Sequence, residues 1–225
     1  MVTKRLSIGL GGVIALFASM TAMAEGGAAE RLLWEAAQQG SAAQVRKALE
    51  HGADVEARDN TGATPLLIAT RHNHVNAAKV LIDAGADVNA KDRIHDSPYL
   101  YAGARGYNAI LRMTLAHGAD LTSTNRYGGT ALIPAAERGH VETVNLLIAA
   151  GVDVNHVNNL HWTALLEAIL LGNDGVSHTA IVRALIQGGA DVNLADGDGV
   201  TPLSHARQRG YKDIEALLVR AGARE

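Results

Sequence analysis

The 225-residue sequence has no cysteine, few aromatic residues and no long apolar run beyond its first two dozen positions. Without cysteine, the chain forms no disulfide and performs no thiol chemistry. Only 4% of its residues are aromatic although 48% are apolar, so alanine and leucine must fill the core, which favours tightly stacked helices. The formal charge of −3 disfavours general nucleic-acid binding, because that function needs a basic surface.

The first 24 residues have the pattern of a secretory signal peptide. Lys4 and Arg5 precede an apolar segment over residues 6–17, and Ala22 and Ala24 match the small-residue pattern of a cleavage site. The apolar segment is short for a membrane span, so a cleaved signal peptide is favoured and an uncleaved N-terminal anchor is the alternative. We therefore expect a periplasmic protein.

Cleavage after Ala24 would leave residues 25–225 with 18 Lys and Arg against 23 Asp and Glu, a formal charge of −5. This acidic chain is expected to be a monomer with no membrane span and no nucleic-acid partner.

Two sequence patterns recur with one period. Glycine before Ala-Asp or a close variant appears in steps of 33, 33, 33, 38 and 33, at Gly52, Gly85, Gly118, Gly151, Gly189 and Gly222. A Thr-Pro-Leu pattern follows the same steps, beginning at Thr64, Ser97, Thr130, Thr163 and Thr201. Such internal periodicity indicates a repeat protein.

Each repeat is predicted to hold two helices. The Thr or Ser hydroxyl caps the first helix, where proline fits the first turn. A second helix such as "VETVNLLIAA" has apolar residues at helical spacing, and the glycine then ends it. An Asp/Asn-rich turn such as "ADVNAKDR" leads to the next repeat. The predicted class is all-α.

On these two patterns the sequence resembles the ankyrin-repeat family, and within it the secreted proteins of bacteria. The resemblance implies a solenoid of about six helix pairs, with turns that project as fingers from one edge and a concave groove. The predicted units are about 30–62, 63–95, 96–128, 129–161, 162–199 and 200–225. The family's usual histidine after Thr-Pro-Leu is absent, since Leu67, Leu100, Ile133, Leu166 and Ser204 stand there.

The segment "NNLHWTALLEA" departs most from the repeat. His161, like His95, occupies a turn position where glycine is usual, which histidine adopts at some cost. Glu167 stands at a position that is usually apolar, and His205 is its equivalent in the next unit. A buried carboxylate needs a partner, and His205 is the candidate that we expect. The pair is interpreted as a structural contact rather than an acid–base site.

No motif predicts catalysis, metal binding or a cofactor. The sequence has no Gly-x-Ser-x-Gly and no cysteine nucleophile, and "DGDG" at 196–199 lacks the rest of a calcium loop. A small-molecule or hydrolytic site around Glu137, Glu167 and His205 is the rival hypothesis, and a purely structural scaffold is a third.

The resemblance implies that proteins bind to the finger tips and inner helices. The side chains typical of binding hot spots concentrate in units three to five. The predicted partner-binding residues are Arg93, Ile94, Arg105, Arg126, Tyr127, Arg138, Leu160, Trp162, Leu170 and Leu171. The arginines would suit acidic groups; alternatively, Leu160 and Trp162 pack against adjacent fingers.

Five extra residues fall within "LLGNDGVSH" of unit five, where either the first helix lengthens or the turn becomes a loop. The expected function is recognition of another exported protein, not enzymatic catalysis. The resemblance implies that binding restrains, protects or stabilises an enzyme, such as a catalase or a wall hydrolase.

Overall fold

The computed structural model describes residues 27–225, which form a row of helix pairs. Residues 27–39 are helical and pair with α2 (Ala42–Glu50). The following pairs are α3 (Pro65–Arg71) with α4 (Val75–Asp83), α5 (Pro98–Arg105) with α6 (Asn108–Ala116), α7 (Leu132–Glu137) with α8 (Val141–Ala150), α9 (Ala164–Leu170) with α10 (Val176–Gln187), and α11 (Pro202–Arg209) with α12 (Lys212–Arg220).

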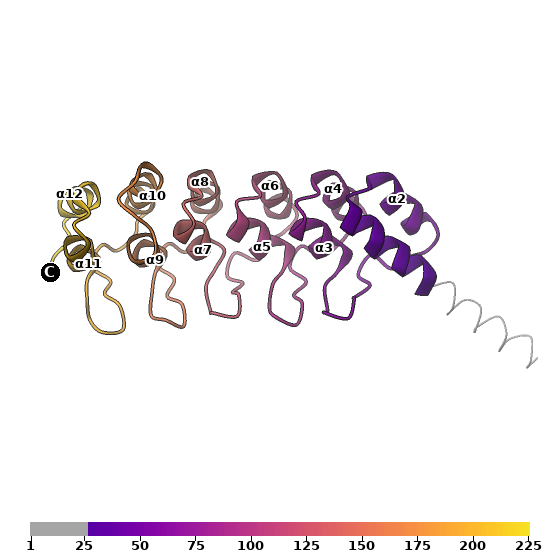
Figure 1. Ribbon diagram of the computed structural model, residues 1–225, viewed down its shortest axis with the longest axis horizontal. Coiled ribbons are helices and arrows are strands. Elements are labelled where there is room, and N and C mark those ends of the chain that lie inside the picture. The colour runs from indigo at the N-terminus through magenta and orange to yellow at the C-terminus, as the bar shows by residue number, and fades with distance from the viewer. Residues whose placement is uncertain (1–26) are drawn as a thin grey trace, which may run out of the picture.

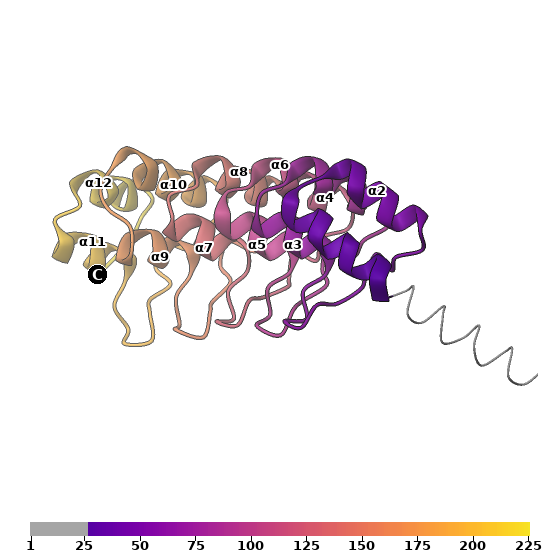
Figure 2. The same cartoon turned by 45° about the vertical axis from the view of Figure 1, so that its right-hand side comes forward.

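The odd-numbered helices from α3 onward form one row and their partners a second row, and both views agree on this arrangement (Figures 1 and 2). The loops that join successive pairs project to one side as fingers. The described part of the chain therefore has the predicted all-α solenoid architecture. The predicted signal peptide, residues 1–24, lies outside the described residues.

The repeated Thr or Ser starts most inner helices by capping. The side-chain oxygens of Thr64, Ser97, Thr163 and Thr201 each accept a hydrogen bond from the backbone N–H three residues later, at 3.2 Å. Unit four differs, because Ala131 is already helical in backbone conformation and precedes α7. The buried Thr130 hydroxyl consequently has no hydrogen-bond partner among the described residues.

Small and branched apolar side chains build a continuous core through the row. Leu66, Leu111, Leu132 and Leu165 are completely buried, and alanines fill the spaces between helices. Gly103 marks one of the closest approaches: a Cβ atom built on it would lie 2.8 Å from the Cβ of Ala131 on the next unit. Tight helix packing therefore replaces the aromatic core that the composition excludes.

An Asp or Asn at the base of each finger organises its turn. Asn158, for example, accepts hydrogen bonds through Oδ1 from the backbone N–H groups of Leu160 and Trp162. The same two-bond pattern occurs at Asp59, Asp92, Asn125 and Asp196. As expected, His95 and His161 replace glycine in these turns with φ of 66° and 59°.

The family's usual histidine is missing, and other polar residues connect the units in its place. His74 donates from Nε2 to the Gln38 carbonyl, and His178 donates to the Glu137 carbonyl, at 3.0 and 2.9 Å. Asn89 and Asn155 in the fingers accept from the N–H groups of the next unit's Asp120 and Asp191. These bonds supply the inter-unit polar contacts that the sequence left in doubt.

The five-residue insertion is divided between two elements. The inner helix α9 is not lengthened, and residues 171–175 form the connection to α10. Helix α10 has 12 residues, whereas α4 and α6 have nine each, so its first turn holds the remainder of the insertion.

Among the described residues, no helix is long and apolar enough to cross a membrane.

We predict that Gly103→Ala destabilises the protein by about 1–2 kcal/mol, even though alanine is the better helix former, because the added methyl overpacks the contact with Ala131. Urea unfolding followed by circular dichroism measures this loss. Gly27→Ala is the matched control, since its Cβ would meet no atom within 4 Å. Equal stability of both variants would contradict the packing argument.

Candidate functional site

The fingers and inner helices of units three to five enclose a pocket of about 370 Å³, which we call the central pocket. Its walls come from α5, α7, α9 and the fingers before them. The residues that line it include Asp96, Tyr101, Arg105, Asn125, Arg126, Tyr127, Thr130, Pro134, Glu137, Arg138, Asn158, Leu160 and Glu167.

The pocket forms because one repeated position changes its side chain. Ile68, Tyr101, Pro134, Glu167 and His205 occupy this position in successive units. In unit four the short ring of Pro134 stands between the longer side chains of Tyr101 and Glu167, and all three line the pocket. A proline side chain has no polar atom to meet the finger base, which leaves space at this point in the row.

Glu167 is the buried acid of the pocket, with 5% of its surface exposed. Its Oε1 accepts a hydrogen bond from Asn158 Nδ2 at 2.9 Å. Burial, together with repulsion from the nearby carboxylate of Glu137, raises the pKa of Glu167 from its ordinary value of 4.5 to about 7. Near neutral pH this carboxyl is therefore present in both its protonated and its ionised form.

The expected contact between Glu167 and His205 is wrong. Glu167 bonds to Asn158, whereas His205 Nε2 donates to Asp196 Oδ2 at 2.7 Å. Both bonds join an inner helix to the base of the finger that directly precedes it in the chain. Each finger loop turns back so that its base lies beside the start of the inner helix that follows it. The axes of neighbouring helices, in contrast, are separated by about 8–10 Å. Glu167 and His205 therefore belong to two separate polar contacts.

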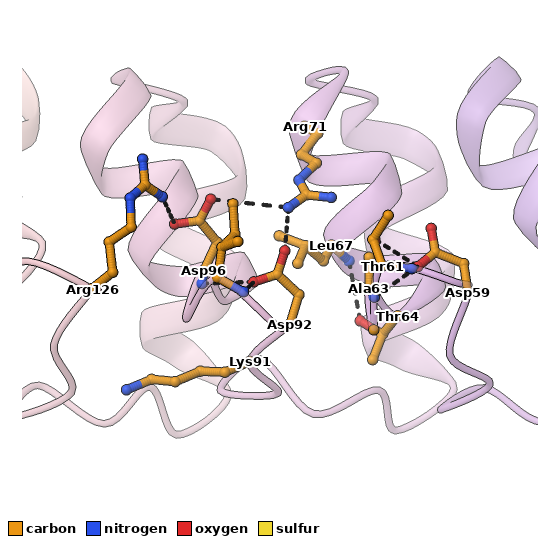
Figure 3. A network of polar contacts seen from close by, with 12 residues as sticks. Asp59, Thr61, Ala63, Thr64, Leu67, Arg71, Lys91, Asp92, Asp96 and Arg126 are labelled. Atoms are coloured by element: carbon orange, nitrogen blue, oxygen red, sulfur yellow. Dashed lines mark hydrogen bonds and ion pairs between the residues drawn. The ribbon is translucent and has the colours of Figure 1, made fainter.

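The charged side chains around the pocket form ion pairs and aromatic contacts with neighbouring side chains. Asp96 lies between Arg71 and Arg126, with nitrogen-to-oxygen distances of 3.9 Å to each (Figure 3). Arg126 also stacks over the ring of Tyr127, and Arg105 over Tyr101, at 4.8 and 5.4 Å from the ring centroids.

Arg138 donates to the Ala104 carbonyl at 2.6 Å. It is therefore held against the preceding unit, and the guanidinium groups around the pocket already have protein neighbours.

The structure brings half of the predicted binding residues to this pocket. Arg105, Arg126, Tyr127, Arg138 and Leu160 line it, whereas Arg93, Ile94, Trp162, Leu170 and Leu171 lie elsewhere. Tyr127 and Leu160 are 56% and 54% exposed, so Leu160 is not covered by an adjacent finger. Trp162 and Leu170 are half-buried, and the other six predicted residues are exposed.

Sequence reasoning missed Tyr101, Thr130 and Pro134 as pocket residues. Proline at a position that holds longer side chains in the other units was the available signal. Within the described residues, no group of three or more His, Asp and Glu side chains could hold a metal ion.

Comparison with known proteins decides the family. The family description "Ankyrin repeats (3 copies)" matches residues 15–92 and 99–178, and "Ankyrin repeat" matches residues 160–197. The chain belongs to the ankyrin-repeat family. Members of this family provide surfaces for protein–protein interaction, so binding of other proteins is the general function, and no catalytic family is indicated.

Solved structures and a relative agree with this assignment. An ankyrin repeat domain from Acinetobacter baumannii AYE is 64% identical, with a TM-score of 0.84 over 85% of this chain and 98% of that one. The ankyrin repeat protein EF0377 is 43% identical, with a TM-score of 0.82 over the same shares. The ankyrin repeat protein YahD of Escherichia coli K12 is 47% identical over 57 residues, 25% of this chain and 28% of its own length.

We predict that the contribution of Glu167 to the stability of this ankyrin protein falls as pH rises from about 4.5 to about 7. Because the pKa of Glu167 is higher in the folded chain than in the unfolded chain, folding takes up a proton between pH 4.5 and pH 7. The protonated form of Glu167 therefore contributes its full stabilisation below about pH 4.5, and this contribution is lost as pH rises through 7. Glu167→Gln should flatten this dependence by about 1–2 kcal/mol, allowing for screening by water in the pocket.

Urea unfolding at pH 5, 6, 7 and 8 measures this slope. The matched control is Glu50→Gln, at an exposed position of α2, which should keep the slope of the native chain. An unchanged slope in Glu167→Gln would show that another group governs the pH dependence.

Proposed function

We propose that this ankyrin protein acts in the periplasm by binding another exported protein across the central pocket and its rim, and so restrains, protects or stabilises it. The observation that carries the proposal is the position of Tyr127 and Leu160. Both are more than half exposed, stand on adjacent fingers and border one pocket. Exposed aromatic and apolar side chains around a pocket are typical of binding hot spots.

The shape of the site supports binding to a preformed surface. Tyr127 and Leu160 are held by finger turns whose N–H groups bond to Asn125 and Asn158. A backbone hydrogen bond from Asn159 N–H to the Tyr127 carbonyl, at 3.0 Å, joins the two fingers. Because the loops are already ordered, binding requires little loss of conformational entropy.

We predict that Tyr127→Ala combined with Leu160→Ala abolishes capture of the partner. The tagged 25–225 chain is incubated with periplasmic extract, and retained proteins are identified by mass spectrometry. Loss of two central hot-spot side chains should weaken binding by about 2 kcal/mol or more, roughly 30-fold. This pair is preferable to Trp162→Ala, because Trp162 is half-buried and its loss would also affect folding.

Val176→Ala is the control, since Val176 is 90% exposed and lies outside the pocket. The proposal predicts a protein that the native chain and the control retain and the double variant loses. Equal retention by all three chains would refute the assigned surface.

The proposed location rests on the signal pattern of residues 1–24. We predict that the protein from a periplasmic fraction begins at Glu25, because Ala22 and Ala24 fit the cleavage pattern. Mass spectrometry of the intact protein measures this terminus. Replacement of Ala24 by a bulky residue should leave the precursor uncleaved, and an unprocessed native chain in the cytoplasm would refute the location.

A further inference from the structure

The central pocket contains two acids that the protein leaves incompletely paired. The Glu137 carboxylate has no hydrogen bond or ion pair with any described residue, and Glu167 has one bond, to Asn158 through Oε1. Both carboxyl groups line the same pocket, and their charges repel each other. A carboxylate removed from water is stabilised by a counter-charge or by hydrogen bonds, so the buried Glu167 and the half-buried Glu137 can each accept a hydrogen bond from a donor that enters the pocket.

A second polar group points to the same conclusion. Thr130 lines the pocket with only 1% of its surface exposed, and its hydroxyl has no partner among the described residues. Buried hydroxyl groups in folded proteins are nearly always hydrogen-bonded. The equivalent Thr163 uses its oxygen as a helix cap, so the unused hydroxyl of Thr130 is particular to this unit.

Among the described residues, no arginine of the pocket forms an ion pair with Glu137 or Glu167, although the charge of Arg138 lowers the pKa of Glu167. Arg126 lies 3.9 Å from Asp96, Arg105 lies over the ring of Tyr101, and Arg138 donates a hydrogen bond to the Ala104 carbonyl. The buried side chains of the pocket with unused hydrogen-bonding capacity are Glu167, whose ionised carboxylate accepts, and Thr130, whose hydroxyl can accept or donate. An incoming group with several N–H donors and a positive charge is complementary to them.

We propose that the central pocket receives one basic side chain, lysine or arginine, of the bound protein, with its charged end between Glu137 and Glu167. The proposal rests on the proposed protein-binding function and specifies the chemistry of the partner. The negative formal charge of the chain is consistent with a basic partner surface.

The affinity of the central pocket for a basic side chain should depend on pH. A cation binds the ionised form of Glu167, and burial places the pKa of this group at about 7 in the empty pocket. Binding therefore releases a proton, and affinity rises between pH 6 and pH 8. The elements packed against α9 carry these other charged or titratable groups: Glu137 of α7 and Arg138 at its C-terminal cap, His178 and Arg183 of α10, and His205, Arg207 and Arg209 of α11. Of these, Glu137 and Arg138 line the pocket and shift the pKa of Glu167, whereas His205 pairs with Asp196.

Short peptides test the proposal directly. Acetyl-Ala-Ala-Arg-Ala-Ala-amide is titrated into the 25–225 chain and followed by amide NMR shifts, beside peptides with lysine, neutral citrulline or glutamate at the central position. We expect the arginine and lysine peptides to shift residues around Glu137 and Glu167 and to bind about tenfold more tightly than citrulline, and more tightly at pH 8 than at pH 6.

Glu137→Gln and Glu167→Gln should each weaken the basic peptides about tenfold and remove most of the preference over citrulline. Glu142→Gln removes the same charge from α8, where the side chain is 61% exposed, and should leave binding unchanged. No saturable shift up to about 10 mM, equal binding of arginine and citrulline, or stronger binding of the glutamate peptide would each overturn the proposal.

The capture experiment separates this inference from the proposed function. If Tyr127→Ala with Leu160→Ala loses the partner while Glu137→Gln with Glu167→Gln retains it at native affinity, the binding surface stands and the basic-side-chain inference fails. If the Tyr127 and Leu160 variant retains the partner, the proposed surface fails, whatever the peptides show.

Discussion

The structure depends on the contact between successive helix pairs. A single pair cannot enclose its own apolar face, so each unit is completed only by its neighbours. This constraint explains the low aromatic content, because alanine and leucine allow inner helices to approach as closely as Gly103 and Ala131 do. It also fixes the direction of every finger, since all inner helices pack in one row and the loops before them project to one side (Figure 1).

The Asp or Asn at each finger base converts this regular stack into a surface with individual chemistry. Its Oδ1 bonds to the turn in each of the five fingers, so only its second side-chain atom is free to contact the inner helix. Asn158 uses that atom for Glu167, and Asp196 uses it for His205. Asn125 faces the position of Pro134, and the central pocket opens there. A change of one side chain in a repeated position thus distinguishes one unit from the others.

Much of the fold could be predicted from the sequence. The steps of 33 and 38 residues, the capping Thr or Ser and the terminal glycines gave the helix pairs, because local hydrogen bonding and backbone conformation determine each of these signals. The positive φ of His161 followed in the same way from its place in the turn. The division of the insertion between a loop and the first turn of α10 did not, since both solutions satisfy the local pattern.

The sequence alone determined the family and the repeat register, because these follow from periodic local structure. Only the tertiary structure decided which side chains meet. Register placed Glu167 and His205 at equivalent positions, but a hydrogen bond needs atoms about 3 Å apart, and the finger base brings Asn158 to that distance instead. The central pocket likewise exists only where units three to five come together, since no single repeat contains its walls.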